Sequence, residues 1–329
     1  MLGLSFGLAV PTVSAQGRDL PAVQLPAAFR EMPLGAQAVP SPWWKGFEET
    51  ALEDWLVAAR KHQPARAALE ARIKSLNQGW SSRAAEQNAL LAEIERLDAH
   101  NEREVIEVVL ELRSLEARHG LAERQRSLAA EALDLVRQRL GAGLASAADE
   151  HQMSGAAVRA EAMVARLARE RMAAEGRLGG LAGAPQLQVP VQASSRMLMP
   201  LPLPAATPRA LLARADVRAA ALRPAGRDVS ASELDAAYRE ALLRAVDEVE
   251  AAYAALQLAQ KQKTLAEARV ALAIRQSMNV RMQLEAGRAA RGAMIEADLQ
   301  TVDAQLQLQE AALLSLRALA RLHFSLGQR

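Results

Sequence analysis

The side chains that most often carry metal or acid–base chemistry are sparse and scattered in this sequence. Its five histidines form neither a His-x-x-x-His nor a His-x-x-Glu-His pattern, and they are His62, His100, His119, His151 and His323. Cysteine is absent, which excludes disulfides, thiolate ligands and a cysteine nucleophile. We interpret the histidines as helix-surface residues and expect no enzymatic activity, no metal site and no cofactor.

Carboxylates gather just after two glycine-containing stretches. They are Asp149, Glu150, Glu296 and Asp298. One interpretation is that they begin helices, because a carboxylate near a helix N-terminus is stabilised by the positive end of the helix dipole. Whether they also act on a partner or a passing solute depends on the elements that hold them.

The composition predicts long helices. Half of the 329 residues are hydrophobic and only 3% are aromatic, and alanine and leucine supply most of the apolar side chains. The 40 lysines and arginines and the 38 aspartates and glutamates give a formal charge of +2, and the two signs alternate along the chain. We therefore do not expect nucleic-acid binding.

Seven-residue repeats of apolar side chains predict coiled-coil seams. Spacings of four and three residues recur in three sets, which are Met153, Ala157, Ala160, Val164 and Leu167; Leu242, Val246, Val249, Tyr253 and Leu256; and Ile295, Leu299, Val302 and Leu306. Many seam positions are alanine, which lets helices approach closely. Such narrow seams do not provide the broad apolar face of a single globular core.

The two halves of the helical region resemble each other at a constant shift of 144 residues. This shift aligns Gly143 with Gly287 and Gly183 with Gly327. Because an ungapped register that aligns rare glycines is hard to obtain by chance, we infer an internal duplication.

Glycines near the middle of each half predict a tight reversal between two long helices. Gly141 and Gly143 follow a helix of about 37 residues in the first half, and Gly287 and Gly292 occupy the corresponding region of the second. Glycine adopts left-handed backbone conformations without steric cost and ends helices. The predicted fold is all-α, with duplicated long antiparallel helical hairpins.

Proline-rich stretches divide the chain. Residues 1–15, an apolar run that ends in small residues, are predicted to be a signal peptide, with a buried N-terminal segment as the alternative, and 16–42 an extended leader. The first hairpin is then expected at 43–183, a proline-rich linker at 184–208 and the second hairpin at 209–329. No stretch reaches the roughly 18 apolar residues of a membrane-spanning helix. We expect an exported protein.

Several motifs, in this order, resemble those of the TolC-like outer-membrane efflux channels. "PSPWWKGFEETALEDW" resembles the start of the family through Trp43, Trp44 and Phe47. "RLGAGLAS" is similar to a hairpin tip of the family. "LLARADV" resembles the family's mid-chain signature through Leu211, Leu212, Arg214, Asp216 and Val217. The resemblance covers about 40–329 of the chain.

This resemblance implies a homotrimer whose hairpins form a hollow, coiled-coil α-barrel in the periplasm. It also implies two partners, which are a periplasmic adaptor protein that docks on the glycine tips and an inner-membrane transporter. The tip residues that it assigns to docking are Leu140, Gly143, Ser146, Leu284 and Gly287. The acidic residues that it places at the periplasmic entrance are Asp149 and Glu296, for which the helix-start interpretation stays open.

One departure from the family concerns the strands that close its outer-membrane β-barrel. Residues 76–87 and 222–233 stand where those strands belong, and neither stretch holds the about 9 to 11 residues of alternating polarity that a membrane strand needs. We expect the β-barrel segments to be missing or vestigial. The absence of cysteine also removes the usual lipid anchor, so we do not expect the chain to insert into the membrane by itself.

The expected function is that of a periplasmic, outer-membrane-associated duct component of a tripartite efflux system, of the RND type or a related one, which exports small molecules or metal ions. One alternative is a periplasmic structural coiled coil that has kept the fold and lost transport. Another is a non-functional remnant. Binding of an adaptor protein by a trimer in solution would separate the first possibility from the second.

Overall fold

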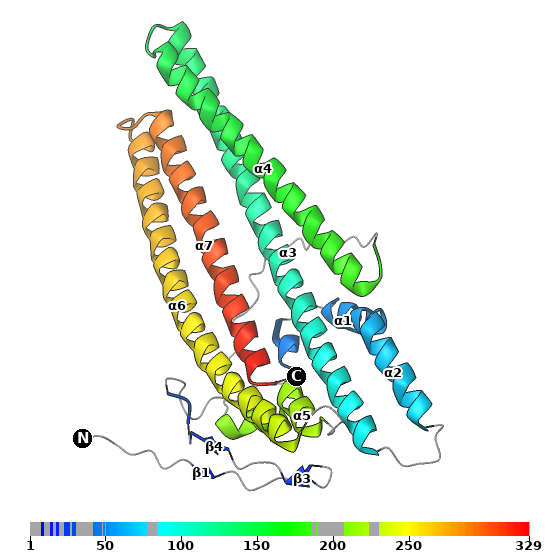
Figure 1. Ribbon diagram of the computed structural model, residues 1–329. Coiled ribbons are helices and arrows are strands. Elements are labelled where there is room, and N and C mark those ends of the chain that lie inside the picture. Colours follow the sequence, from blue (N-terminus) through cyan, green and yellow to red (C-terminus); the bar gives the residue numbers. More distant parts are fainter. Residues whose placement is uncertain are drawn as a thin grey trace, which may run out of the picture.

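The computed structural model describes residues 8–9, 14–15, 18–19, 23–26, 28–30, 42–47, 49, 51–77, 84–185, 189, 207–223 and 230–328. Its four long helices are α3 (Ala84–Gly141), α4 (Ala147–Ala182), α6 (Ala231–Glu285) and α7 (Arg291–Ser325). Helices α3 and α4 form one antiparallel hairpin and α6 and α7 form the other, which confirms the predicted all-α fold (Figure 1). Because α3 also packs along α7, the helices stand in a row in the order α4, α3, α7, α6.

Helix α3 is longer than the sequence led us to expect. It has 58 residues, whereas about 37 were predicted before Gly141. Residues 84–119 contain neither proline nor glycine, so no residue type in that range breaks the helix. Gly120 lies inside the helix, where an added Cβ would meet no atom of the described residues within 4 Å. A single glycine of this kind costs only about 1 kcal/mol.

The seams within each hairpin bury the predicted heptad positions. All three predicted sets are buried or half-buried. Leu167 of α4 is fully buried, and Ala160 and Ala174, one heptad before and after it, are buried as well. These small side chains let α4 approach α3 closely, as in other narrow coiled-coil seams. The seams within the hairpins are therefore apolar and tight.

The seam between the two hairpins is more polar. Along it, α3 and α7 are joined by contacts of 2.6–2.8 Å, which are Arg118 with Glu310, Arg317 with Glu111, and Gln125 with Asp303. Ion pairs at a partly exposed seam contribute little individually, typically about 1 kcal/mol or less, but they fix register and exclude mismatched partners. The α3–α7 contact therefore sets how the hairpins align, and apolar packing elsewhere contributes most of the stability.

Short helices cover one end of the row. They are the 3-10 turn η1 (Trp43–Phe47), α1 (Leu52–Lys61), α2 (Pro64–Asn77), the 3-10 turn η2 (Pro208–Ala213) and α5 (Ala215–Leu222). Helix α1 packs on α3 and α4, and α5 packs on α3 and α6. Helix α1 thus packs on the first hairpin and α5 on both hairpins, at the end opposite the glycine turns (Figure 1).

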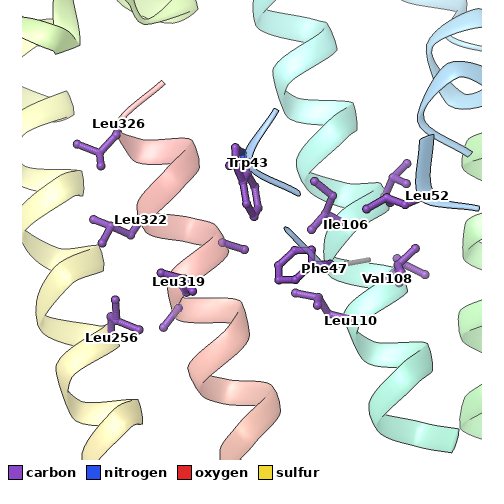
Figure 2. Close-up of a cluster of buried hydrophobic side chains, with 14 of the residues drawn as sticks. Trp43, Phe47, Leu52, Ile106, Val108, Leu110, Leu256, Leu319, Leu322 and Leu326 are labelled. Carbon is purple, nitrogen blue, oxygen red and sulfur yellow. The ribbon is translucent and has the colours of Figure 1, made fainter. Parts of the chain in front are cut away.

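Most of the largest buried side chains lie toward this end, where the short elements meet the long helices. Figure 2 shows Trp43 and Phe47 between α7 and α3, with Ile106 and Leu110 on the α3 side. Trp43 is only 1% exposed. The aromatic segment is therefore fastened to the helical body, and the apolar core is concentrated away from the glycine turns.

His323, in the last turn of α7, packs against Trp43. Its ring stacks on Trp43 with a centroid distance of 4.5 Å and an angle of 3° between the planes. His323 is fully buried, and its Nδ1 lies 2.8 Å from the Oε1 atom of Gln328. The expectation that every histidine lies on a helix surface is wrong for this one, because the last turn of α7 faces the aromatic segment and not solvent.

Arg214, which lies between η2 and α5, binds the same end of α7. Its guanidinium donates to the carbonyl oxygen of Ser325 at 2.8 Å and to the carboxylates of Asp216 at 2.6 Å and Glu248 at 2.7 Å. Gly327 lies so close that a Cβ there would come within 2.7 Å of the Arg214 Cγ atom. Arg214 and Asp216, noted as part of a motif, therefore fix the end of the second hairpin.

Four two-residue strands lie within the predicted signal peptide and leader. β1 (Leu8–Ala9) pairs with β4 (Gln24–Leu25), and β2 (Ser14–Ala15) pairs with β3 (Arg18–Asp19), both antiparallel. Cleavage after residue 15 stays a prediction. Residues 78–83, 224–229 and most of 184–208 lie outside the described residues. What the sequence predicts for these residues therefore stays a prediction. Within the described part, no helix is long and apolar enough to cross a membrane.

Candidate functional site: the two hairpin tips

The first hairpin turns at Gly143. Its φ angle is 73°, whereas Gly141 is the last residue of helix α3. The Gly143 N–H donates to the Leu140 carbonyl at 2.9 Å, and the Leu144 N–H donates to the Arg139 carbonyl at 2.7 Å. This pair of bonds is a Schellman motif, which satisfies carbonyls at the end of a helix and requires a left-handed residue. The reversal therefore depends on Gly143 and not on Gly141.

The second hairpin turns in the same way at Gly287. Its φ angle is 69°, and its N–H donates to the Leu284 carbonyl at 2.9 Å. The Arg288 N–H donates to the Gln283 carbonyl at 2.7 Å, which completes the same motif. Gly292, which the sequence suggested as part of the turn, lies in the first turn of α7. One glycine per tip therefore makes each turn.

Positive φ angles confirm the duplication. Among the described residues the glycines with such angles are Gly143, Gly183, Gly287 and Gly327. These are the two pairs that the shift of 144 residues aligns. Gly183 and Gly327 end the returning helices α4 and α7, so each half uses one left-handed glycine at its tip and one at its far end.

The returning helix of the first tip begins with a capping box. The Ser146 Oγ accepts from the Asp149 N–H at 3.2 Å, and the Asp149 Oδ2 accepts from the Ser146 N–H at 2.8 Å. Hydrogen bonds from the Ser146 backbone and then from its hydroxyl lower the pKa of Asp149. Ala290 and Ala293 occupy the corresponding positions of the second tip, where Ala290 makes no side-chain cap. Only the first tip is capped.

The acidic residues after the tips have different local roles. Asp149 belongs to the capping box, so for it the helix-start interpretation holds. Glu150 pairs with Arg137 across the hairpin at 3.0 Å, and Asp298 accepts from the Ser277 hydroxyl at 2.8 Å. Glu296 lies beyond the first turn of α7 and is exposed. Its side chain makes no hydrogen bond or ion pair with the described residues. Entrance roles for Asp149 and Glu296 stay predictions.

The predicted docking residues gather at two exposed tips. Gly143, Ser146 and Gly287 are exposed, and the leucines at the matching positions, Leu140 and Leu284, are half-buried. Leu144, which is not among the predicted docking residues, is 69% exposed and follows the positive-φ glycine. Each tip therefore presents a glycine turn beside apolar side chains, which is a kind of surface that can bind a protein.

The two tips end at different levels along the helix axes. The Arg291 guanidinium, where α7 begins, lies 2.5 Å from the Glu131 carboxylate of α3. A Cβ on Gly292 would lie 3.5 Å from the Leu135 side chain. Helix α3 continues from Leu135 to Gly141, about 9 Å at 1.5 Å per residue, so the first tip projects past the second (Figure 1).

The tips carry no catalytic or metal-binding constellation. Within the described residues, no group of three or more histidine, aspartate or glutamate side chains is placed to hold a metal ion. The carboxylates near the first tip are engaged by Ser146 and Arg137.

Known structures share this architecture, although the sequence matches no protein-family model and no curated protein. The outer-membrane channel OprN superposes with a TM-score of 0.76 at 16% identity, over 99% of each chain. The outer membrane protein VceC from Vibrio cholerae gives 0.67 at 15% identity, over 88% of this chain and 99% of that one. The Campylobacter jejuni CmeC outer membrane channel gives 0.69 at 10% identity, over 94% of each chain.

The likeness extends from the short helices to the glycine tips, because the alignments cover nearly all of the chain. Identities of 10–16% are too low to transfer residue roles, but TM-scores of 0.67–0.76 show a common fold. The duplicated hairpins, the row of four long helices and the short helices at one end are therefore the TolC-like fold of outer-membrane efflux channels.

Proposed function

We propose that this chain is the periplasmic duct component of a tripartite efflux system, which exports small molecules or metal ions. The observation that carries the proposal is the match to the channel OprN over 99% of both chains. A likeness of that extent includes the hairpins that would line a duct and the tips that would meet a partner. We place the protein in the periplasm, associated with the outer membrane.

The open edges of the helix row support assembly from several copies. Helices α4 and α6 stand at the two ends of the row (Figure 1). Met172 and Val158 of α4 are 70% and 63% exposed and stand two heptads apart. Along α6, leucines at heptad spacing are 57–64% exposed, and they are Leu258, Leu265 and Leu272. Two unfilled apolar edges on one chain favour a closed ring of copies, which we propose to be a homotrimer.

The tips support docking of a second protein. In this proposal a periplasmic adaptor protein contacts the surface that includes Leu140, Gly143 and Ser146 in the first hairpin and Leu284 and Gly287 in the second. Asp149 and Glu296 stand just behind it, at the entrance of the duct. The adaptor connects the duct to an inner-membrane transporter, which drives transport.

The test is a substitution that adds a charge to a tip without straining its turn. Gly141 is helical and exposed, and an added Cβ would meet no atom of the described residues within 4 Å, so Gly141→Glu leaves the backbone unstrained. We expect the variant to lose binding to a periplasmic adaptor protein, and to lose resistance to toxic substrates when it replaces the wild-type gene. Helical content, measured by circular dichroism, should stay unchanged.

Gly120→Glu is the matched control. Gly120 is also helical, exposed and in open space, but it lies on the shaft of α3. It should bind the adaptor and support resistance as the wild type does. Normal resistance with Gly141→Glu, or equal loss with both variants, would contradict the docking role. A folded oligomer that binds no adaptor would instead indicate the structural coiled coil.

A further inference from the structure

The second hairpin carries an exposed apolar strip that ends just before its tip. Ile274, Met278 and Met282 follow one another at intervals of four residues on α6 and are 40%, 59% and 58% exposed. At 100° per residue, successive members are displaced by about 40°, so the three form one continuous strip over the last turns of the helix. We call these three residues the methionine face.

Arginines flank the methionine face on both sides. Arg275 and Arg281 lie three residues before and after Met278, which places them about 60° to either side of it around the helix axis. A third arginine, Arg288, follows the turn. All three are exposed, and none of their side chains makes a hydrogen bond or ion pair with the described residues. The methionine face is therefore an apolar strip between arginine side chains that make no ion pair with the described residues.

The first hairpin does not repeat this surface. The shift of 144 residues places Ala130, Asp134 and Gln138 at the positions of the methionine face. At the position that corresponds to Arg275, the first hairpin has Glu131, whose carboxylate already binds Arg291. Two copies of one ancestral hairpin have therefore acquired different surfaces, and the apolar, positively flanked one belongs to the second hairpin only.

The methionine face is also separate from the apolar edge of α6. Leu272, the last leucine of that edge, lies six residues before Met278 and hence about 120° around the helix from it. The seam with α7 uses another side, where Ala273 and Ser277 are buried. A neighbouring copy seated on the leucine edge would therefore leave the methionine face open.

We propose that the methionine face binds an amphipathic helix of a partner protein, whose apolar strip is flanked by glutamates or aspartates. Methionine side chains are flexible and adapt to the shape of an apposed helix. Carboxylates flanking the partner's apolar strip would reach Arg275 and Arg281, as charged flanks do across a coiled-coil seam. The inference rests on the proposed function for the setting, since it gives one part of the docking partner a chemistry.

The test uses two synthetic helices and the full-length oligomer. One peptide of about four heptads carries leucine at the seam positions and glutamate on both flanks, and the other carries lysine on the flanks. By fluorescence anisotropy, the glutamate peptide should bind at least about tenfold more tightly than the lysine peptide. Met278→Asp with Met282→Gln, which installs the residues of the first hairpin, should weaken it by about tenfold or more. Arg275→Glu with Arg281→Glu should reverse the preference.

Leu144→Asp is the control, because Leu144 is 69% exposed at the other tip. It should bind the glutamate peptide as the wild type does. Equal binding of both peptides, unchanged binding by the methionine variant, or loss of binding by Leu144→Asp would overturn the proposal. So would a change of oligomer mass in the methionine variant, since that would place the face between copies.

The outcomes are distinguishable from a failure of the proposed function. If Gly141→Glu leaves export intact while peptide binding depends on Met278 and Met282, the tips are not the export docking site but the methionine face still binds helices. If Gly141→Glu abolishes export while the methionine variant keeps normal peptide binding, the duct role stands and this inference falls.

Discussion

His323 is buried, although the residues next to it in the sequence suggest an exposed position. It lies on a helix rich in leucine and alanine, with Arg321 close by, so the sequence favours an exposed position. In the structure the ring is sealed between Trp43 and the end of the chain. Burial, partly opposed by the hydrogen bond with Gln328, lowers its pKa to about 4 from an ordinary value of 6.5.

This setting makes stability depend on pH. Between pH 6.5 and about 4 the unfolded chain binds a proton at His323 and the folded chain does not, so the free energy of unfolding should fall as the pH falls through that window. The loss attributable to this histidine should be on the order of 3 kcal/mol. Urea unfolding at fixed protein concentration, repeated from pH 7 to pH 4, measures it.

His323→Phe is the control, because phenylalanine keeps an aromatic ring against Trp43 and does not titrate. The variant should have a flatter dependence of stability on pH across the same window. The same slope in both proteins would mean that groups other than His323 account for the dependence.

At the scale of helices and turns, the sequence predicted much of the fold because repeats of 144 and of seven residues are visible without any structure. The hairpins, the seams and the positive-φ pair Gly143 and Gly287 followed from them. The start of α3 did not, because a long run without proline or glycine has no residue type that marks where a helix begins. The distinction between Gly141 and Gly143 also needed the backbone, since both glycines suit a turn.

That distinction gives a paired prediction. Gly141→Ala should raise the free energy of unfolding by about 0.5–1 kcal/mol, because Gly141 is helical and alanine reduces the entropy of the unfolded chain. Gly143→Ala should lower it by about 1–2 kcal/mol, because its φ of 73° strains any residue with a Cβ. Thermal or urea unfolding of both variants at one protomer concentration measures the difference. Shifts of the same sign would contradict the assignment of the turn.

Parts of the candidate site also could not be predicted from the sequence. The capping box could be expected from Ser146 and Asp149, but the position of Glu296 beyond the first turn of α7 could not, because the start of that helix is set by an uncapped alanine. The methionine face and the difference in height between the tips depend on which sides of α6 and α3 are already covered. Contacts between distant segments determine this, and local residue patterns do not encode it.

At the scale of the whole molecule, the proposed assembly depends on the unfilled edges of the row. Leu265 sits in the middle of the exposed leucine edge of α6 and is 64% exposed. Leu265→Glu should convert the oligomer to monomers at micromolar concentration, because a buried charge without a partner costs several kcal/mol. Light scattering coupled to size-exclusion chromatography measures the mass. Leu144→Glu, an equally exposed leucine at a tip, should leave the mass unchanged.

A consequence for evolution follows from the stacking of Trp43 on His323. The helical body begins and ends at the same place, since Trp43 opens the first short turn and His323 lies in the last turn of α7. The order of the two hairpins along the gene is therefore not imposed by packing. A circularly permuted gene that joined residue 328 to residue 42 and opened the chain between the hairpins would encode the same neighbours, so shuffling and fusion of hairpin units are open to this architecture.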